Sequence, residues 1–485
     1  MKRLSNILSS TEFISFTASS DVEIHALQYD SRKVEAGDCF FAVRGTQTDG
    51  HEYISKAVEA GAAVVVCEEL PSTMRDDVSY VVVADSNVAM ADMAAAFYDN
   101  PSHQLKLVGV TGTNGKTTVA TLLCDLFGAL GYRAGLISTV VYRVGEREIE
   151  STHTTPDAIR LNAMLREMVD AGCDYCFMEV SSHALVQERV RGLRFRGAIF
   201  TNLSHDHLDY HGTFAEYIKA KKLLFDRLDK KAFALVNVDD RNGEVMVQNC
   251  RAQVSRYSLR TLADFRCKVL EMLFDGMLLR MGQHELWVKF LGRFNAYNLL
   301  SVYGAAMLLG ADEGEVLQAM SGLQSVSGRF EPLHSEQGVT AIVDYAHTPD
   351  ALEKVIATIN DIRSGAGQLI VVCGCGGDRD ATKRPEMGRI AARESDLAIL
   401  TSDNPRTESP EAILEQMMAG VEAGRRVLRI VDRREAIRTA VMMARKGDII
   451  LVAGKGHETY QIVGREKHHF DDREELRAAF AELGR

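Results

Sequence analysis

Short apolar runs alternate with amphipathic stretches along the chain, and this alternation predicts strands and helices. The clearest case begins at residues 105–110, an apolar run that predicts a buried strand. After a polar turn that contains two glycines, apolar residues recur three and four positions apart over residues 119–130, as on one face of a helix. This part of the chain therefore predicts a strand, a glycine loop and a helix in succession.

The first hundred residues predict a small α/β domain. Residues 38–43 and 62–66 are strand-like, and an amphipathic helix is expected between them, over residues 52–60. A polar loop flanked by glycines, residues 44–50, joins the first strand to the helix. Pro101 follows as a linker, so we place this N-terminal domain at residues 1–100.

Residues 101–331 predict a central domain with a mostly parallel sheet covered by helices. Further strands are expected at residues 134–137, 175–180 and 198–202, alternating with helical stretches. With the glycine loop, this pattern is typical of a P-loop-type ATPase domain.

Residues 332–485 predict a C-terminal domain with a second, Rossmann-like open α/β sheet. Strands are expected at residues 340–344, 369–372, 397–400, 427–431 and 449–452. Four of these runs lead into polar clusters, at residues 344–347, 374–379, 403–406 and 454–458. Ligands of open α/β sheets bind beyond the carboxyl ends of the strands, so we expect the four clusters to face one cleft.

The glycine loop predicts a phosphate site. Two glycines let successive N–H groups converge on a phosphate at a helix N-terminus, a lysine can reach the terminal phosphates, and a threonine can offer its hydroxyl to Mg2+. The loop is a shortened relative of the common P-loop, because Val110 stands where the first glycine is usual. The alternative is an ordinary glycine turn between a strand and a helix, but the Gly-Lys-Thr-Thr sequence that ends the motif argues against it. The motif comprises Gly112, Thr113, Asn114, Gly115, Lys116, Thr117 and Thr118.

Several polar groups of the central domain leave two interpretations open. Glu179 ends a predicted strand, where it can be a second Mg2+ ligand; the alternative is that a glutamate or a serine of this segment caps a helix. Residues 205–211 hold three histidines, but their spacing favours one imidazole at a Mg2+ site over a closed zinc site. The lysines at 219–222 are typical of a solvated helix face. Asn295 and Asn298 can cap a helix or present amides to a base.

Composition narrows the class of protein. The formal net charge of −11 argues against nucleic acid as a partner, because a phosphate backbone is held by a basic surface. No apolar stretch is long enough to cross a bilayer, and the nine cysteines show no disulfide framework. We expect a cytoplasmic monomer that binds small molecules and does not insert into membranes.

Five motifs in a fixed order carry a resemblance. Residues 112–118, 179–183, 295–298, 328–330 and 344–347 make the chain similar to the Mur ligases over essentially its whole length. The resemblance implies three domains, which bind the UDP part of a substrate, ATP and an incoming amino acid. It also implies the reaction: ATP phosphorylates the D-Glu carboxylate of a UDP-N-acetylmuramoyl dipeptide, and the amine of meso-2,6-diaminopimelate attacks the acyl phosphate.

The resemblance also assigns roles to positions. It implies catalytic roles for Lys116, Glu179, His207 and Lys221, with Mg2+ at Thr117, Glu179, His207 and Lys221, and it implies that Lys221 is an N6-carboxylysine. ATP contacts are implied for the glycine loop and for Asn298, Arg329 and Asp344. The dipeptide site would comprise Tyr29, Ser31, Thr46, Gln47, Thr48, His153, Thr154, Thr155, Ser181, Gln187 and Arg189, with His153 departing from the family's usual asparagine. The diaminopimelate site would comprise Arg379, Asp403, Asn404, Pro405, Arg406, Gly454 and Glu458.

Arg406 decides the expected amino acid. Diaminopimelate differs from L-lysine by one carboxylate beside its second amine, and a planar guanidinium can pair with that group in bidentate fashion. The alternative is that Arg406 only pairs with the nearby Glu408 on the surface.

Two other functions compete with this hypothesis. Folylpolyglutamate synthetases are similar in the phosphate loop and also form an acyl phosphate, but the UDP-site loop and residues 403–406 argue against them. A nucleotide-binding transporter or regulatory ATPase would bind ATP without making a bond.

Overall fold

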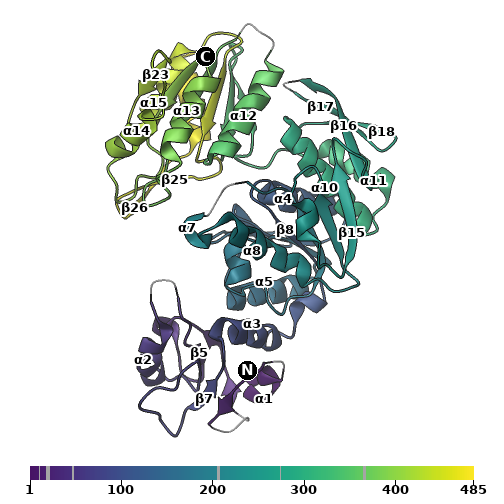
Figure 1. The fold of residues 1–485 in the computed structure, drawn as a ribbon, viewed down its shortest axis with the longest axis vertical. Helices are drawn as coiled ribbons and strands as arrows, with labels where there is room; N and C mark the ends of the chain where they lie inside the picture. Colours follow the sequence, from purple (N-terminus) through teal and green to yellow (C-terminus); the bar gives the residue numbers. More distant parts are fainter. Residues whose placement is uncertain are drawn as a thin grey trace.

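The chain forms three α/β regions that follow one another in space as in sequence (Figure 1). A computed structural model describes residues 1–9, 11–17, 22–45, 48–204, 208–273, 275–363 and 367–484. In Figure 1 the N-terminal region lies at the bottom, the central region in the middle and the C-terminal region at the upper left.

The N-terminal region is a five-stranded sheet in the order β2-β7-β6-β5-β4. Neighbours from β4 to β7 pair in parallel, and only β2 is antiparallel. The strands are β2 (Ser15–Phe16), β4 (Leu27–Gln28), β5 (Cys39–Phe41), β6 (Val64–Cys67) and β7 (Ser79–Val82), and the helices are α1 (Leu4–Leu8), α2 (Ile54–Glu59) and α3 (Ser86–Phe97). A separate small ladder joins β1 (Lys2–Arg3) to β3 (Glu23–Ile24).

The central region is built on an eleven-stranded sheet in the order β11-β10-β9-β12-β8-β13-β14-β15-β16-β17-β18. Its middle, from β9 to β16, is parallel, and antiparallel strands extend both edges. The parallel strands are β8 (Lys106–Thr111), β9 (Ala134–Ile137), β12 (Tyr175–Glu179), β13 (Phe195–Phe200), β14 (Phe233–Asn237), β15 (Gln253–Ser258) and β16 (Phe265–Leu273); the edges are β10 (Val141–Val144), β11 (Arg147–Glu150), β17 (Gly276–Met281) and β18 (His284–Val288). The helices are α4 (Lys116–Ala129), α5 (Ala158–Asp170), α6 (Ser182–Val186), α7 (Leu208–His211), α8 (Phe214–Asp226), α9 (Gly243–Met246), α10 (Arg293–Leu308) and α11 (Glu313–Gly322).

The C-terminal region is a six-stranded sheet in the order β19-β20-β24-β21-β22-β23, parallel except for β19. A hairpin, β25 with β26, extends from it. The strands are β19 (Glu331–His334), β20 (Thr340–Asp344), β21 (Leu369–Cys373), β22 (Leu397–Leu400), β23 (Val427–Arg429), β24 (Ile449–Ala453), β25 (Tyr460–Val463) and β26 (Glu466–His469). The helices are α12 (Pro349–Ile362), α13 (Arg384–Glu394), α14 (Pro410–Met418), α15 (Arg433–Met443) and α16 (Asp472–Glu482).

Each sheet is buried on both faces, which is why its inner strands are continuously apolar. In β21, for example, Leu369 and Val371 pack into one core while Ile370 and Val372 pack into another. The central sheet divides its side chains in the same way, with Leu107 on one face and Val108 on the other.

Two details differ from the sequence prediction. The C-terminal sheet begins at β19, so Glu331, which was expected to end the central unit, starts the next sheet as part of an antiparallel edge strand. The lysine run on α8 is not uniformly solvated: Lys219 is exposed, whereas Lys221 is only 1% exposed. A helix that packs on a sheet turns successive residues to different sides, so neighbouring lysines can have opposite environments.

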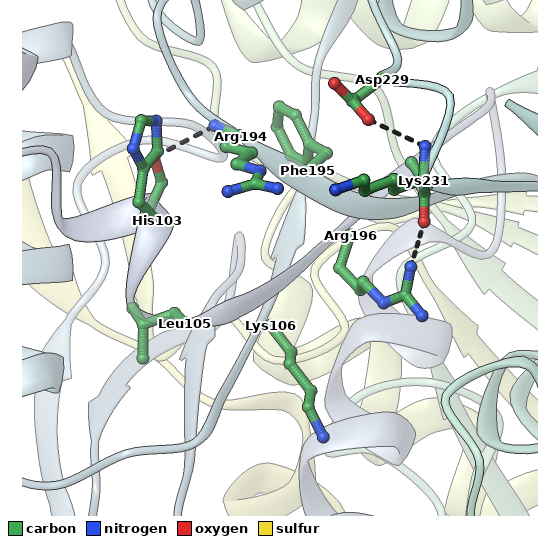
Figure 2. Close-up of a pocket in the computed structure, with 10 residues that line it drawn as sticks. His103, Leu105, Lys106, Arg194, Phe195, Arg196, Asp229 and Lys231 are labelled. Atoms are coloured by element: carbon green, nitrogen blue, oxygen red, sulfur yellow. Dashed lines mark hydrogen bonds between the residues drawn. The ribbon is translucent and has the colours of Figure 1, made fainter. Parts of the chain in front are cut away.

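A cavity of about 630 Å3 lies at the amino ends of β8, β13 and β14 (Figure 2). Its lining includes Lys106, Arg194, Arg196 and Lys231. The phosphate loop follows the opposite end of β8, and no residue predicted from sequence as part of the site lines this cavity within the described chain. Separately, none of the helices that the structure describes has the length and apolar character of a membrane span.

Candidate active site

The phosphate loop, residues 112–118, joins β8 to α4 as the sequence predicts. Gly115 has φ +89°, in the left-handed region, and a Cβ there would lie 2.5 Å from Asn298 Oδ1. Both the backbone conformation and the close approach therefore require glycine at this position. The loop after β13 holds the phosphate loop in place: Thr113 N donates to the Asn202 carbonyl at 2.8 Å, and Asn114 N donates to Asn202 Oδ1 at 3.0 Å.

Two lysines converge on one carbonyl of this loop. Lys116 Nζ donates to the carbonyl oxygens of Gly112 and Thr113 at 3.0 and 2.9 Å. Lys221 Nζ, from α8, donates to the same Gly112 oxygen at 2.8 Å and lies 4.7 Å from the centre of the Tyr217 ring. The buried Lys221 is thus brought to the phosphate loop although it follows Gly112 by 109 residues in the sequence, as parallel βα units allow.

Thr117 is contacted from the segment that links the two sheets. Its Oγ1 accepts a hydrogen bond from Arg329 Nη2 at 3.1 Å. The Arg329 guanidinium also lies over the Tyr345 ring, 4.6 Å from its centre. Arg329 therefore joins the predicted Mg2+-binding hydroxyl to the first loop of the C-terminal region.

Glu179 is a buried carboxylate at the end of β12, only 1% exposed. Its Oε1 accepts from Thr139 N at 2.6 Å, and its Oε2 has no hydrogen-bond partner among the described residues. The helix-cap alternative, in which a glutamate or a serine of this segment caps a helix, is confirmed for the serine: Ser181, and not Glu179, caps α6 by accepting from Ala184 N. A buried carboxylate oxygen without a donor suits a metal ion, since a cation can supply the missing interaction.

The residues predicted to hold the UDP-muramoyl dipeptide in the central region form one connected group. Thr155 Oγ1 donates to the Glu179 carbonyl at 2.8 Å and accepts from Ser181 N. Arg189 Nη1 donates to the Thr155 carbonyl at 2.7 Å, and Arg189 Nη2 donates to Gln187 Oε1 at 2.6 Å. Thr154 Oγ1 accepts from Thr139 Oγ1 at 3.1 Å, which brings Thr154 close to Glu179 as well.

The N-terminal residues of this predicted set approach from the first sheet. Burial, with Asp157 beside it, raises the pKa of Tyr29, and Arg189 also faces the phenol. Ser31 is buried in a short 3₁₀ turn capped by Asp30. Thr48 closes a turn by accepting from Gly45 N at 2.9 Å.

His153 is the position that departs from the family pattern, and its ring is exposed. Its backbone is held by Tyr142, whose hydroxyl donates to the His153 carbonyl at 2.5 Å. Thr46, Gln47 and His207 lie outside the described residues, so nothing is said of their placement.

A cavity of about 420 Å3 opens between the central and C-terminal regions. The phosphate loop forms one side, α10 another, and the loop after β20 with α12 a third. Six of the predicted ATP contacts line it together: Asn114, Gly115, Thr118, Asn298, Arg329 and Asp344. The two regions also touch directly here, because Asn114 Nδ2 donates to Asp350 Oδ2 at 2.9 Å.

Burial shifts the pKa of two groups here, Asp344 in the cavity lining and His457 beside the lining residue Tyr345. Burial raises the pKa of Asp344 to about 6, although Phe330 N and Ala346 N donate to its carboxylate at 2.7 and 2.8 Å. Burial, with Arg329 nearby, lowers the pKa of His457 to about 3, so this imidazole is neutral at neutral pH.

Sequence reasoning missed one polar wall of the cavity. Asp239 lies just after β14 and accepts from Tyr297 Oη at 2.8 Å, which ties the strand end to α10. Asp240 beside it accepts from Leu203 N at 2.8 Å. The strand-end rule would have found both residues, had the apolar run of β14 been taken as a strand.

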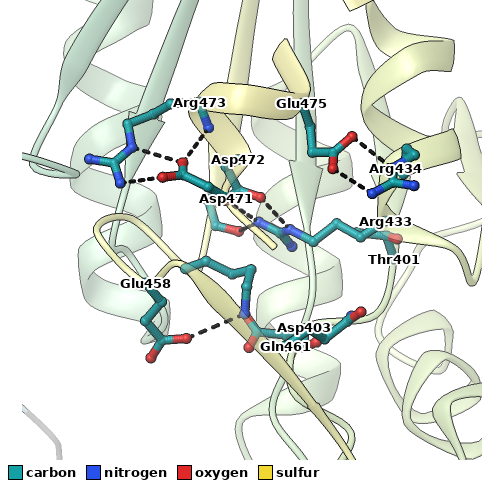
Figure 3. Close-up of polar contacts among 12 residues, drawn as sticks. Thr401, Asp403, Arg433, Arg434, Glu458, Gln461, Asp471, Asp472, Arg473 and Glu475 are labelled. Atoms are coloured by element: carbon teal, nitrogen blue, oxygen red, sulfur yellow. Dashed lines mark hydrogen bonds and ion pairs between the residues drawn. The ribbon is translucent and has the colours of Figure 1, made fainter. Parts of the chain in front are cut away.

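The clusters that follow β20, β24, β21 and β22 lie side by side, since these four strands are neighbours in that order. Asn404 is the centre of the contacts: its Nδ2 donates to Glu458 Oε2 at 2.9 Å, and its Oδ1 accepts from the fully buried Lys455 at 3.1 Å. Burial, and the neighbouring Asp403, raise the pKa of Glu458. Asp403 and Glu458 thus place two acidic groups at one site (Figure 3), and Gly454 approaches so closely that a Cβ there would lie 2.6 Å from Asp403 Oδ2.

Arg406 does not pair with Glu408, so the surface-pair alternative is wrong. Arg406 Nη1 donates to the Gly377 carbonyl at 2.7 Å, and no carboxylate of the described chain forms an ion pair with this guanidinium. Glu408 instead accepts two hydrogen bonds from Arg384, each of 2.8 Å. Arg379 is exposed on the neighbouring loop, and Pro405 is buried between the loops.

Comparisons with known proteins give a consistent result. Family models described as the Mur ligase family catalytic domain, the Mur ligase middle domain and the Mur ligase glutamate ligase domain match residues 23–98, 110–306 and 328–456. A UDP-N-acetylmuramoyl-L-alanyl-D-glutamate--2,6-diaminopimelate ligase of Bacteroides fragilis is 55% identical over 481 residues, with 99% of each chain covered.

Solved structures agree in fold. A UDP-N-acetylmuramoyl-L-alanyl-D-glutamate--2,6-diaminopimelate ligase aligns with a TM-score of 0.71 and 33% identity, covering 100% of this chain and 99% of its own. A folylpolyglutamate synthase of Mycobacterium tuberculosis, complexed with ADP and AMPPCP, aligns with a TM-score of 0.59 at 19% identity, over 76% of this chain and 92% of its own. That second likeness is one of fold alone.

Proposed function

The chain belongs to the Mur ligase family, and we propose that it adds meso-2,6-diaminopimelate to UDP-N-acetylmuramoyl-L-alanyl-D-glutamate. ATP-dependent ligation is the activity of this family, and the product is a precursor of peptidoglycan. The reaction converts the D-Glu carboxylate to an acyl phosphate, which the amine of diaminopimelate attacks. Phosphate then leaves from a tetrahedral intermediate, and ADP is the other product.

The phosphate loop performs the first half of this reaction. A phosphoryl group in transfer carries negative charge that must be stabilised by fixed donors and cations. Lys116 stands at the N-terminus of α4 with its ammonium held against the loop, where ATP phosphates would replace the two carbonyl acceptors. Asn114, Asn298, Arg329 and Asp344 bind the rest of the nucleotide, because they line one cavity. That shared cavity is the observation that carries the proposal.

Mg2+ fits the carboxylate and hydroxyl at this loop. Glu179 Oε2 is buried without a donor in the described chain, and Thr117 Oγ1 faces the same loop. We assign these two groups, with His207, to the ion. The bound ion would neutralise charge on the phosphates, and the residues of the chain orient the reactants around it.

Lys221 is assigned as an N6-carboxylysine. The side chain is buried and reaches the Gly112 carbonyl of the phosphate loop, which places its terminal atom beside the phosphate site. A carbamate would replace a cation by an anion with two oxygens, which a buried position near divalent metal favours. Native mass spectrometry at elevated CO2 should show the added mass of a carbamate on Lys221. Short carboxylic acids should rescue the activity of Lys221→Ala, and a failure of that rescue would contradict the assignment.

The second half of the reaction belongs to the C-terminal region. Glu458, Asn404 and Asp403 suit the ammonium groups of diaminopimelate, and Arg406 suits its distal carboxylate. Residues 1–100, 101–331 and 332–485 serve as the domains for the UDP moiety, for ATP and for the amino acid. Tyr29, Ser31, Thr48, Thr154, Thr155, Ser181, Gln187 and Arg189 hold the UDP-muramoyl dipeptide, with Thr46, Gln47 and His153 completing the set.

Substrate dependence tests the function directly. The purified chain should release phosphate from ATP only when both UDP-muramoyl dipeptide and diaminopimelate are present. Release without an amino acid would favour a regulatory or transport ATPase, and turnover of a folate alone would favour a folylpolyglutamate synthase. Preference for L-lysine over diaminopimelate would overturn the assignment of the amino acid.

The proposal also covers location and assembly. We propose that the enzyme works in the cytoplasm, where its nine free cysteines would stay reduced, and that it is a monomer. Light scattering of the purified protein checks the monomer.

A further inference from the structure

An ion pair between a buried arginine and a partly exposed glutamate lies beneath the proposed diaminopimelate site. Arg384, at the start of α13, is only 1% exposed, and its Nη1 and Nη2 donate to the two carboxylate oxygens of Glu408 at 2.8 Å each. Nη1 also donates to Gln416 Oε1 at 2.8 Å, and Nη2 to the Gly376 carbonyl at 3.1 Å. A bidentate pair of this kind fixes both partners in direction as well as distance.

This pair connects two loops, residues 374–379 after β21 and residues 403–408 after β22, which we call the amino-acid loops. Glu408, on the second loop, also accepts from Asp378 N on the first loop at 2.5 Å. Gly377 N donates to the Asn404 carbonyl at 2.9 Å, and a Cβ on Gly377 would lie 1.9 Å from the Pro405 carbonyl oxygen. The loops are therefore packed backbone against backbone, and Arg384 contacts both.

The amino-acid loops contain two non-glycine residues in left-handed conformations. Asp378 has φ +53° and Arg406 has φ +52°. Such conformations persist only where surrounding contacts hold them. Thr407 Oγ1 donates to Asp378 Oδ1 at 2.8 Å, and the Arg384–Glu408 pair anchors the same two turns from below.

The pair also keeps Glu408 away from Arg406. Hydrogen bonds from Arg384 lower the pKa of Glu408 to about 2, so its carboxylate is ionised at neutral pH. An ionised Glu408 without Arg384 would be two residues from the Arg406 guanidinium and would compete with a substrate carboxylate for it. With both oxygens of Glu408 engaged, the Arg406 guanidinium donates to the Gly377 carbonyl through Nη1 and to no carboxylate of the described residues, while the Arg406 backbone is bonded to Ile462 and Gly464.

We propose that Arg384 and Glu408 are positioning residues that orient Arg406 for the distal carboxylate of diaminopimelate and thereby set the choice of amino acid. This inference rests on the proposed function. It predicts that the pair affects diaminopimelate through Arg406 and leaves the nucleotide and UDP sites unchanged.

A double-mutant cycle on the full-length enzyme tests the proposal. Glu408→Gln, Arg406→Ala and the double variant are compared with the parent by the KM for diaminopimelate, for ATP and for the UDP-muramoyl dipeptide. Glu408→Gln should raise the KM for diaminopimelate by about tenfold or more, because a small misplacement of a binding group costs this much, while the other two KM values stay near those of the parent. The double variant should be no worse than Arg406→Ala alone, because both changes act on the same interaction.

Glu475→Gln is the matched control. Glu475 accepts two hydrogen bonds of 2.8 Å from Arg434 in the same region, so the chemical change is identical at a pair away from the site (Figure 3). Its KM values should equal those of the parent. Arg384→Lys, which keeps the buried charge but loses the fork, supplies a second test if Glu408→Gln unfolds, and should also raise the KM for diaminopimelate selectively.

Three results would overturn the inference: KM values that rise together for all substrates, a double variant whose loss is the sum of the two single losses, or an effect no larger than that of Glu475→Gln. A parent enzyme that does not add diaminopimelate would overturn the proposed function instead. That outcome is seen before any variant is compared, so the two failures are distinguishable.

Discussion

The phosphate loop and the amino-acid loops both stand at the carboxyl ends of parallel strands, but they are held in different ways. In the phosphate loop, glycine occupies the left-handed position, and the contacts from outside the motif include those of the loop after β13 and of Lys221. In the amino-acid loops, Asp378 and Arg406 occupy left-handed positions, and the pair of the buried Arg384 with Glu408 helps to hold them, beside backbone hydrogen bonds between Arg406 and the β25–β26 hairpin. The motif of the first loop supplies the glycine that its left-handed position needs, whereas the left-handed residues of the second depend on a side chain from a separate helix.

The largest difference between the two regions should appear when each loses its principal cation. We expect Lys116→Ala to reduce ligation by about 100- to 1000-fold, because fixed donors to a developing charge are worth that much. Steady-state rates with all three substrates saturating measure the effect. Activity within about tenfold of the parent would contradict the role of Lys116.

Arg406→Ala should produce a loss confined to the amino acid. Truncating one partner of a desolvated charge pair costs about 2 to 5 kcal/mol, which is roughly 30-fold to several thousand-fold in kcat/KM for diaminopimelate. ATP affinity should remain near that of the parent, since Arg406 does not line the nucleotide cavity. An equal loss of affinity for ATP would show that Arg406 supports the whole cleft.

The comparison explains what could be predicted from the sequence. The phosphate loop, and strands such as β9, β20 and β22, could be predicted residue by residue, because a motif or a buried apolar run specifies them locally. The edge β16–β18 was missed: several of its positions are exposed, and β17 and β18 join the sheet only through antiparallel pairing that begins at β16, which itself pairs with β15.

Parts of the candidate site could not be predicted from local sequence patterns either, because they depend on contacts between segments that are distant in sequence. Arg384 carries no motif, and its role comes from contacts with Glu408 and Gly376, 24 and 8 residues away. Lys221 was predicted as a site residue only through resemblance, since a lysine run favours a solvated helix face. Burial of one lysine of that run depends on how α8 packs, which the pattern of charges does not determine.

Two glycine-to-alanine substitutions test whether the phosphate loop needs glycine at its left-handed position. Gly115→Ala puts a Cβ 2.5 Å from Asn298 Oδ1 at a backbone φ of +89°, so we expect a cost of about 1 to 3 kcal/mol in nucleotide binding. Gly128→Ala, on the same helix, meets nothing within 4 Å and should leave ATP binding unchanged. Titration calorimetry with ADP compares the two. Equal affinities would mean that the loop relaxes freely and does not need its glycine.

The smallest effect concerns how two carboxyls of the C-terminal region, Asp344 at the nucleotide cavity and Glu408 at the amino-acid loops, change stability with pH. Asp344 has a folded-state pKa of about 6, raised from 3.8 by burial, so between about pH 4 and 6 the folded state binds more protons than the unfolded state. Its contribution to stability is therefore fully present at low pH and falls as the pH rises through that window. Asp344→Asn should remove this pH dependence of the free energy of unfolding. Urea unfolding midpoints for parent and variant, followed from pH 4 to 7, should diverge in favour of the variant as the pH increases.

Glu408 should show the opposite sign. Arg384 lowers its folded-state pKa from 4.5 to about 2, so the stability that the ion pair contributes is present above the unfolded value and is lost as the pH falls toward 2. Glu408→Gln should thus weaken the protein at neutral pH and converge with the parent in acid, whereas Asp344→Asn should differ from the parent most above pH 6. Because both carboxyls belong to one sheet, the same unfolding transition reports both. Parallel pH profiles for the two variants would mean that burial, and not ion pairing, dominates at Glu408 as it does at Asp344.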